Sequence, residues 1–196
     1  MAYIAPIVEG QGEREAVPAL LHKLKRHLNL EMEIQLDVNE PIRVKSGSFV
    51  NDTKYFEKYL SLAAAKARER GGAVLIILDC DDDCPAELGP QLLARAQTFC
   101  GDIRIVVVLA YREFETWFVA AVESLRGKFG FAKDITRPAT FDMRDAKGWL
   151  GQRMSSKYDP VIHQLKFVRA FDVEQAKAVP SFNRLCSRMH YLLGMS

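Results

Sequence analysis

Two nearly uninterrupted apolar runs place the strongest constraint on how this chain of 196 residues can fold. They occupy residues 73–78 and residues 103–111, and the second reads IRIVVVLAY. Strands that bury one face alternate apolar and polar side chains, whereas continuous apolar strands are typical of parallel sheets covered by helices on both faces. Both runs therefore predict central strands of an α/β protein.

Helical patterns separate the predicted strands. Leucines at helical spacing mark the first helix, and Gly71 and Gly72 follow the second, where a helix commonly ends. The predicted order is strand 3–8, helix 17–28, strand 32–38, helix 53–70, strand 73–78, helix 88–99 and strand 103–111. Right-handed crossovers of this kind pack helices back onto the sheet, so the predicted fold is a Rossmann-like, mainly parallel sheet flanked by helices.

The chain beyond residue 112 reads as helical. Trp117 and Phe118 fall on an apolar stripe and are predicted to be core residues. Asp142, Asp159 and Ser181 are candidate helix N-caps. The glycine- and proline-containing segment 127–140 is the predicted boundary, which gives an α/β domain over residues 1–126 and a small C-terminal helical region over 127–196, packed on it.

Charge is distributed unevenly along the chain. The net charge is +2, but residues 1–127 carry 15 Lys+Arg against 19 Asp+Glu, and residues 128–196 carry 12 against 6. The basic C-terminal part is expected to attract a polyanion such as nucleic acid, with Lys157, Lys166 and Arg169 as the predicted contacts. The alternative is that these side chains only solvate helix faces.

Composition indicates a cytoplasmic protein. Hydrophobic residues make up 48% of the chain, yet no apolar run approaches the roughly 20 residues that span a bilayer, and no membrane partner is expected. The four cysteines are too few and too scattered for a disulfide framework, so reduced thiols are expected.

Acidic residues gather where the predicted strands end. Glu9 and Glu13 follow the first strand, Asp79 and Asp81 follow strand 73–78, and Glu115 follows the last strand. Ligand sites in open α/β sheets lie outside the carboxyl ends of the strands. Clustered carboxylates repel one another unless a cation lies among them, and hard oxygen ligands are the set that Mg²⁺ or Mn²⁺ prefers. These residues are therefore a candidate metal site.

The same residues carry a resemblance to a known superfamily. IVEGQGE at 7–13, followed by LIILDCDDD at 75–83, resembles the Toprim superfamily of topoisomerase, primase and nuclease domains over roughly residues 3–124. The E-x-W-F stretch from Glu115 to Phe118 is similar to that of small standalone Toprim-like proteins of unknown function. These in turn resemble the Toprim half of the overcoming-lysogenization-defect nucleases of phage defence.

The resemblance implies a Toprim-like fold and assigns roles to the acidic residues. Glu9, Asp79 and Asp81 match the catalytic and metal-binding positions, Glu13 matches a second acidic position of the nuclease branch, and Glu115 is a further candidate metal ligand. It also implies a partner ATPase encoded nearby, and a homodimer is left open. The topoisomerase tyrosine domain and the primase zinc region are absent, so neither of those activities is expected.

The expected function is Mg²⁺- or Mn²⁺-dependent phosphodiester cleavage, with a noncatalytic binding subunit of an ATPase complex as the alternative. The chain has no GxxxxGK[ST] loop, which argues against ATP hydrolysis by the chain itself. A cation near the metal is usually needed to neutralise transition-state charge. The candidates are Lys45, Lys54, Arg112 and Lys157.

Overall fold

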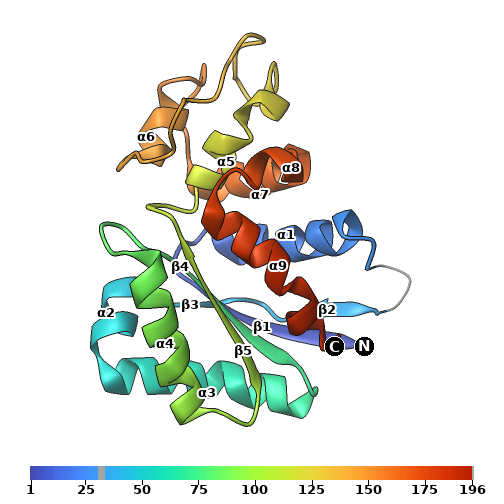
Figure 1. The fold of residues 1–196 in the computed structure, drawn as a ribbon. Coiled ribbons are helices and arrows are strands. Elements are labelled where there is room, and N and C mark those ends of the chain that lie inside the picture. Colours follow the sequence, from blue (N-terminus) through green and yellow to red (C-terminus); the bar gives the residue numbers. More distant parts are fainter. Residues whose placement is uncertain (31–33, 196) are drawn as a thin grey trace.

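The computed structural model of the protein describes residues 1–30 and 34–195 and contains a parallel five-stranded sheet flanked by helices (Figure 1). The strand order is β2-β1-β4-β5, and β3 pairs with β1 further along the same edge. The strands are β1 (Ala2–Val8), β2 (Leu36–Val38), β3 (Ile42–Arg43), β4 (Ala73–Asp79) and β5 (Arg104–Ala110). The two apolar runs at residues 73–78 and 103–111 form β4 and β5, which are neighbours in the sheet.

Register places the acidic strand ends together. Ile7 of β1 pairs with Ile76 of β4, and Asp79 at the end of β4 pairs with Ala110 of β5. Since all these pairs are parallel, the three strands finish at one edge of the sheet. Glu9, one residue beyond β1, and Asp79 therefore lie on adjacent strands, as the sequence predicts.

Helices cover both faces of the sheet. In Figure 1, α1 and α9 lie on one side of the strands and α3 and α4 on the other, and each side has its own cluster of buried apolar side chains. The helices that pack directly on the sheet are α1 (Glu13–His27), α3 (Thr53–Glu69), α4 (Pro85–Phe99) and α9 (Pro180–Leu193). This arrangement confirms the predicted α/β fold class.

The C-terminal part forms a cap over the carboxyl edge and then returns to the sheet. Its elements are α5 (Thr116–Ala120), the 3-10 helix η1 (Val122–Leu125), α6 (Ala146–Gly151), α7 (Pro160–Ala170) and α8 (Val173–Ala176). They stand at the top of Figure 1, above the strand ends, and α9 descends from them along the sheet. One apolar cluster runs from Ala2 through to Leu193, so the core is continuous across the predicted boundary near residue 127.

Several local predictions differ from the structure. β3 and the short helix α2 (Ser46–Asn51) escaped prediction because two- and six-residue elements are too short to show a period. Strand 32–38 is reduced to β2, and residues 31–33 lie outside the described part of the chain. The predicted cap Asp159 is confirmed, since its carboxylate accepts from the Val161 amide at 2.8 Å.

Two of the predicted N-caps are wrong. Asp145, not Asp142, caps α6. Ser181 lies inside α9, and its hydroxyl oxygen accepts from the Tyr111 amide and the Trp117 indole instead. Tertiary partners thus take both side chains away from the capping role that local spacing suggests.

Three further predictions concern the state of the cysteines, the burial of Trp117 and Phe118, and helices that could cross a membrane. All four cysteines are free thiols, as expected. Trp117 and Phe118 are buried, which confirms them as core residues. Within residues 1–30 and 34–195, none of the helices is long and apolar enough to cross a membrane.

The cap is fastened to the α/β part where α1 meets α7. Lys23 on α1 donates to the backbone carbonyls of Val168, at 2.9 Å, and of Phe171, which satisfies acceptors at the end of α7. At the other end of the contact, a Cβ on Gly12 would collide with the carbonyl oxygen of Pro160 and the side chain of Gln164. A glycine is therefore needed for the close approach of the two helices.

We expect Gly12→Ala to lower the free energy of unfolding by about 1–3 kcal/mol, the usual range for overpacking, because the backbone of α7 must move. Chemical denaturation followed by circular dichroism measures the change. Gly47→Ala is the matched control: nothing lies within 4 Å of a Cβ there, and alanine favours a helix, so this variant should be neutral or slightly stabilised. Equal stability of the two variants would contradict the close contact.

Candidate active site

Glu9 and Glu13 form the first part of the site, in the turn that joins β1 to α1. The Glu9 amide donates to Glu13 Oε2 at 3.2 Å, and Glu9 Oε1 accepts from the Ser46 hydroxyl at 2.7 Å. Acidic side chains in the first turn of a helix are stabilised by its dipole. Burial nevertheless raises the pKa of Glu13 to about 7. The turn therefore holds two carboxyl groups side by side, and the charge of Glu13 is disfavoured there.

Asp79 contributes the second part from the end of β4. Its Oδ1 accepts from the Phe114 amide at 2.7 Å, which fixes the carboxylate against the segment that follows β5. Burial, and secondarily the charge of Glu13, raise the pKa of Asp79 well above its usual value. Asp79 and Glu13 thus influence each other electrostatically, as expected for residues of one site.

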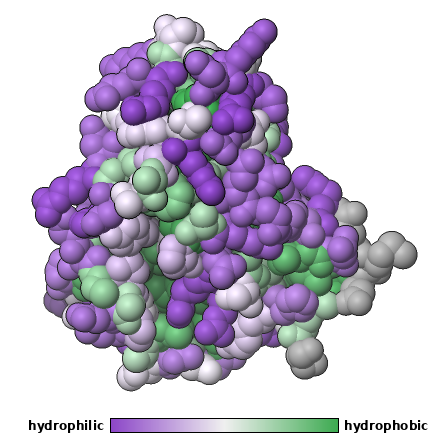
Figure 2. All heavy atoms as spheres, turned by 45° about the horizontal axis from the view of Figure 1, so that its top comes forward, coloured by the Kyte–Doolittle hydropathy of each residue, from purple (hydrophilic) through white to green (hydrophobic). Residues whose placement is uncertain are grey.

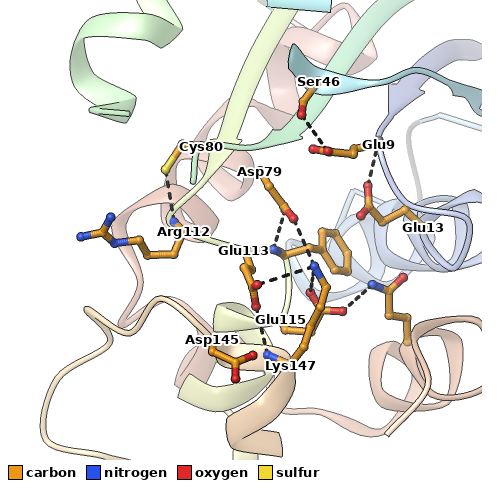
Figure 3. Close-up of polar contacts among 12 residues, drawn as sticks. Glu9, Glu13, Ser46, Asp79, Cys80, Arg112, Glu113, Glu115, Asp145 and Lys147 are labelled. Atoms are coloured by element: carbon orange, nitrogen blue, oxygen red, sulfur yellow. Dashed lines mark hydrogen bonds and ion pairs between the residues drawn. The ribbon is translucent and has the colours of Figure 1, made fainter. Parts of the chain in front are cut away.

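Lys147 is the cation of the cluster, and it comes from the C-terminal cap. Its Nζ lies 3.5 Å from Asp79 Oδ2, 3.6 Å from Glu115 Oε2 and 3.8 Å from Glu113 Oε1. Figure 3 shows the side chain reaching between the three carboxylates. Burial lowers its pKa, but the carboxylates of Glu115, Asp79 and Glu113 outweigh that effect and raise it. The ammonium group is therefore charged throughout the physiological pH range.

Two contacts hold the helix that carries Lys147. The Lys147 amide donates to Glu113 Oε2 at 3.0 Å, and the Gly148 amide donates to Asp145 Oδ1 at 2.7 Å. Helix α6 has only six residues, so these capping bonds rather than its length set its position. The orientation of Lys147 depends on Glu113 as much as on the ion pairs.

Glu115 is the most deeply buried carboxylate of the group, with no exposed side-chain surface. Its Oε1 accepts from the Tyr158 hydroxyl and from Gln164 Nε2, both at 2.9 Å. Oε2 has no hydrogen-bond donor and faces Lys147. Glu115 thus links the cap helices to the cluster and provides a fixed counter-charge for the lysine.

The second aspartate of the Asp-x-Asp pair lies elsewhere. Asp81 is exposed, has a positive φ of 47°, and lines a surface hollow together with Asp82, Arg112 and Arg144. The Arg112 side chain is held in this hollow by two contacts. It donates to the Asp81 carbonyl at 3.1 Å and forms an ion pair with Asp82 at 2.7 Å. The structure brings Glu9, Glu13 and Glu115 close enough to Asp79 to act on it electrostatically, and it leaves Asp81 beside this cluster.

The three predicted substrate-binding residues are distributed along the cap. Lys157 lines a second hollow, together with Lys147 and Tyr158 of the cluster. Lys166 and Arg169 are exposed on α7, six and nine residues beyond its first residue, Pro160. Only Lys157 borders the site directly.

The donor atoms of this cluster fit a hard divalent cation. Among the described residues, Glu9 Oε2 and Glu115 Oε2 are buried without a hydrogen-bond partner, although Lys147 lies 3.6 Å from Glu115 Oε2. Burial of such an atom costs free energy that a bound cation would offset. The carboxylates are oxygen ligands, which Mg²⁺ and Mn²⁺ favour. Within the described residues, no three His, Cys, Asp or Glu side chains already surround one point as a ligand set. Binding would therefore require the carboxylates to draw together.

A comparison with protein families places the chain. The family model described as a domain of unknown function, DUF4276, matches residues 8–190. The chain belongs to the DUF4276 family. No curated protein and no solved structure matches the chain significantly. The match to this family begins in β1 and ends in α9, so it includes both the strand ends and the cap that supplies Lys147.

Sequence reasoning missed Lys147, Tyr158 and Gln164. None of them lies in a motif, and the spacing between Glu115 and Lys147 crosses a long irregular segment. The excess of basic residues after residue 127 was the available signal, because one of them had to neutralise the acidic strand ends. That signal favoured no particular lysine.

The raised pKa of Glu13 predicts a pH dependence of stability. Its folded pKa of about 7 exceeds the ordinary value of 4.5, so the native state binds this proton more tightly than the unfolded chain. The resulting stabilisation is full below about pH 4.5 and is lost as the pH rises through 7, by up to roughly 3 kcal/mol. In EDTA, denaturation of the wild type should show this loss, and Glu13→Gln should reduce it.

Glu15→Gln is the control for this measurement, because Glu15 is exposed on the same helix turn. It should keep the wild-type pH dependence. An identical pH dependence in Glu13→Gln and in the wild type would show that the buried carboxyl does not titrate in this range.

Proposed function

We propose that this protein is a Mg²⁺- or Mn²⁺-dependent phosphodiester-cleaving enzyme of the Toprim type. The observation that supports this most is that Glu9, Glu13 and Asp79, which follow the ends of two adjacent parallel strands, interact electrostatically, with Lys147 next to Asp79. Burial raises the pKa values of Glu13 and Asp79, and such shifts are frequent at functional sites. The E-G turn and the Asp-x-Asp order of the sequence support the same superfamily.

In the proposal, Glu9 and Asp79 hold the metal, and Glu13 joins them as a ligand or as a general base. A bound divalent ion would polarise a phosphoryl oxygen and lower the pKa of a coordinated water. Asp81 is retained as a ligand because its side chain has no hydrogen-bond or ion-pair partner among the described residues and is free to turn. Glu115 is the fifth predicted ligand, through Oε2, which faces Lys147 and has no hydrogen-bond partner among the described residues.

Lys147 is assigned the role of neutralising charge on the phosphoryl group. Its side chain is 41% exposed, so the ammonium can face both the carboxylates and an entering phosphate. A preorganised cation is worth most where charge develops in the transition state. The carboxylates on its other side keep it protonated, and Glu115 fixes its position.

The proposed substrate is nucleic acid, drawn in by the basic cap. Lys157 lines the hollow that also contains Lys147, and Lys166 and Arg169 extend the positive surface along α7. The family resemblance further supports a cytoplasmic role in phage defence or nucleic-acid processing with an ATPase partner. A homodimer remains compatible with this proposal.

One observation favours a second candidate, a noncatalytic subunit of an ATPase complex. Lys147 already neutralises much of the cluster, and no three potential ligands of the described chain surround one point. A cluster stabilised in this way needs no metal. The two candidates differ in whether divalent ions bind and in whether phosphodiesters are cleaved.

The cleavage prediction is tested with single-stranded DNA, plasmid DNA and RNA, each with Mg²⁺ or Mn²⁺. We expect metal-dependent cleavage of at least one substrate, and loss of at least 100-fold in Asp79→Asn and Glu9→Gln because the metal loses ligands. Lys147→Met should lower the cleavage rate by a similar factor without abolishing metal binding. The same assays, run with and without an ATPase encoded nearby, show whether cleavage depends on that partner.

Calorimetry with Mn²⁺ separates the two candidates. The enzyme should bind the ion, gain thermal stability with its concentration, and lose both effects in Asp79→Asn. Glu15→Gln is the control and should behave as the wild type. Absence of Mn²⁺ binding together with absence of cleavage would favour the noncatalytic subunit.

Binding of nucleic acid should depend steeply on salt. Each phosphate contact contributes about 0.7–0.9 to the slope of log K against log salt. Changing Lys157, Lys166 and Arg169 to Gln should flatten this slope while Mn²⁺ binding stays unchanged. Exposed Lys58 and Lys66 on α3, which covers the opposite face of the sheet, provide a control double variant with an unchanged slope. Affinity that is insensitive to salt and to the triple change would show that these residues only solvate helix faces.

A further inference from the structure

An apolar cavity lies apart from the carboxylate cluster, between α4 and α9 beside the free edge of β5. Its volume is about 410 Å³, within the range of about 300–1,000 Å³ typical of small-molecule sites. β5 pairs with β4 on one side only among the described strands, and the two helices flank its other edge (Figure 1). Figure 2 shows hydrophobic atoms along the middle of this side of the molecule, between hydrophilic rims.

The wall of the cavity is formed by small or apolar groups. Val107 and Leu109 of β5 form its floor, and Pro180 of α9 faces the start of α4. A Cβ on Gly89 would meet only the Leu109 Cδ1 atom, at 4.0 Å, so the space above this glycine is open. Apolar surface left open in this way costs free energy that a bound apolar group would recover.

Most polar groups of the wall are already occupied. Ser181 Oγ accepts from the Tyr111 amide at 3.0 Å and from the Trp117 indole at 2.9 Å. The Tyr111 hydroxyl donates to Asp142 Oδ1 at 2.9 Å. These contacts make the wall rigid and leave the hydroxyls with little capacity for a ligand.

Arg184 is the charged group of the wall, which the free thiol of Cys84 also lines. It lines the cavity, it is exposed, and it forms no ion pair among the described residues. A guanidinium beside an apolar cavity matches a carboxylate, sulfonate or phosphate, which it binds through two parallel hydrogen bonds. Among the residues that the structure describes, no carboxylate lines this cavity to compete with such an anion.

We propose that this cavity binds a small amphiphilic anion, whose aliphatic or aromatic body rests on Val107 and Leu109 and whose anionic group pairs with Arg184. The site is independent of the proposed phosphodiester cleavage. It is connected to the cap nonetheless: Tyr111 forms part of its wall and also holds Asp142, which precedes α6 and Lys147. An occupant that displaces Tyr111 would disturb that segment.

The probes are decanoate and decanol, which share an apolar chain and differ in charge. Backbone-amide NMR should show saturable shifts with decanoate, concentrated at Gly89, Val107, Tyr111, Ser181 and Arg184. Arg184→Gln should weaken decanoate binding about tenfold, as expected for one charge-assisted contact, and leave decanol binding unchanged. Ala86→Leu should weaken both probes because it fills the cavity.

Two controls match these variants. Arg188→Gln removes a charge one turn further along α9, and Ala94→Leu adds the same bulk to α4, yet neither residue lines the cavity. Both should bind decanoate as the wild type does. Thermal melting of all four variants confirms that each is folded before its binding is compared.

Three outcomes would overturn the proposal. Shifts that are absent or that fall outside the cavity would exclude the site, and equal loss in Arg184→Gln and Arg188→Gln would reduce it to nonspecific attraction. Analytical ultracentrifugation gives the third: a dimer that decanoate dissociates would show that a second copy of the chain, not a small anion, occupies this face.

Discussion

Burial of negative charge at one sheet edge is the constraint on which the rest of this structure depends. Parallel strands that end side by side bring Glu9 and Asp79 together, and α1 adds Glu13. Carboxylates in a partly desolvated place must be protonated, paired or bound to a cation. The cap supplies the positive charge of Lys147 and donates hydrogen bonds to Glu115. The helical region is therefore part of the site and not an appendage to it.

Most of the fold could be predicted because the apolar runs and the helical spacing in the sequence indicated the same architecture. Continuous apolar runs gave β4 and β5, and helical spacing gave α1, α3 and α4, because these elements bury whole faces and their patterns are long. The shortest elements, β3 and α2, had no pattern long enough to detect. Asp142 and Ser181 had capping chemistry, but their partners are distant in sequence, at Tyr111, Arg112 and Trp117. No local rule could foresee those contacts.

In the candidate site, too, some positions could be predicted from the sequence and others depend on tertiary contacts. Glu9 and Asp79 could be placed together from strand order alone, because parallel strands share a carboxyl edge. The orientation of Asp81 could not be predicted, since it depends on a left-handed backbone conformation and on Arg112 binding the Asp81 carbonyl. The position of Lys147 could not be predicted either, because it depends on how the cap folds over the strands. Charge balance showed that a cation was needed, and only tertiary structure showed which one.

Because α9 follows the strands in the sequence, it can pack on the sheet only after the strands have been synthesised. During synthesis the strands and the acidic strand ends emerge before α9 (Pro180–Leu193), which packs on β5, β1 and β4. Until α9 is in place, α1 covers only part of that face, and the cap that carries Lys147 lacks one of its supports at Ser181. A chain truncated before Pro180 would thus expose apolar surface of the sheet and would be prone to aggregate.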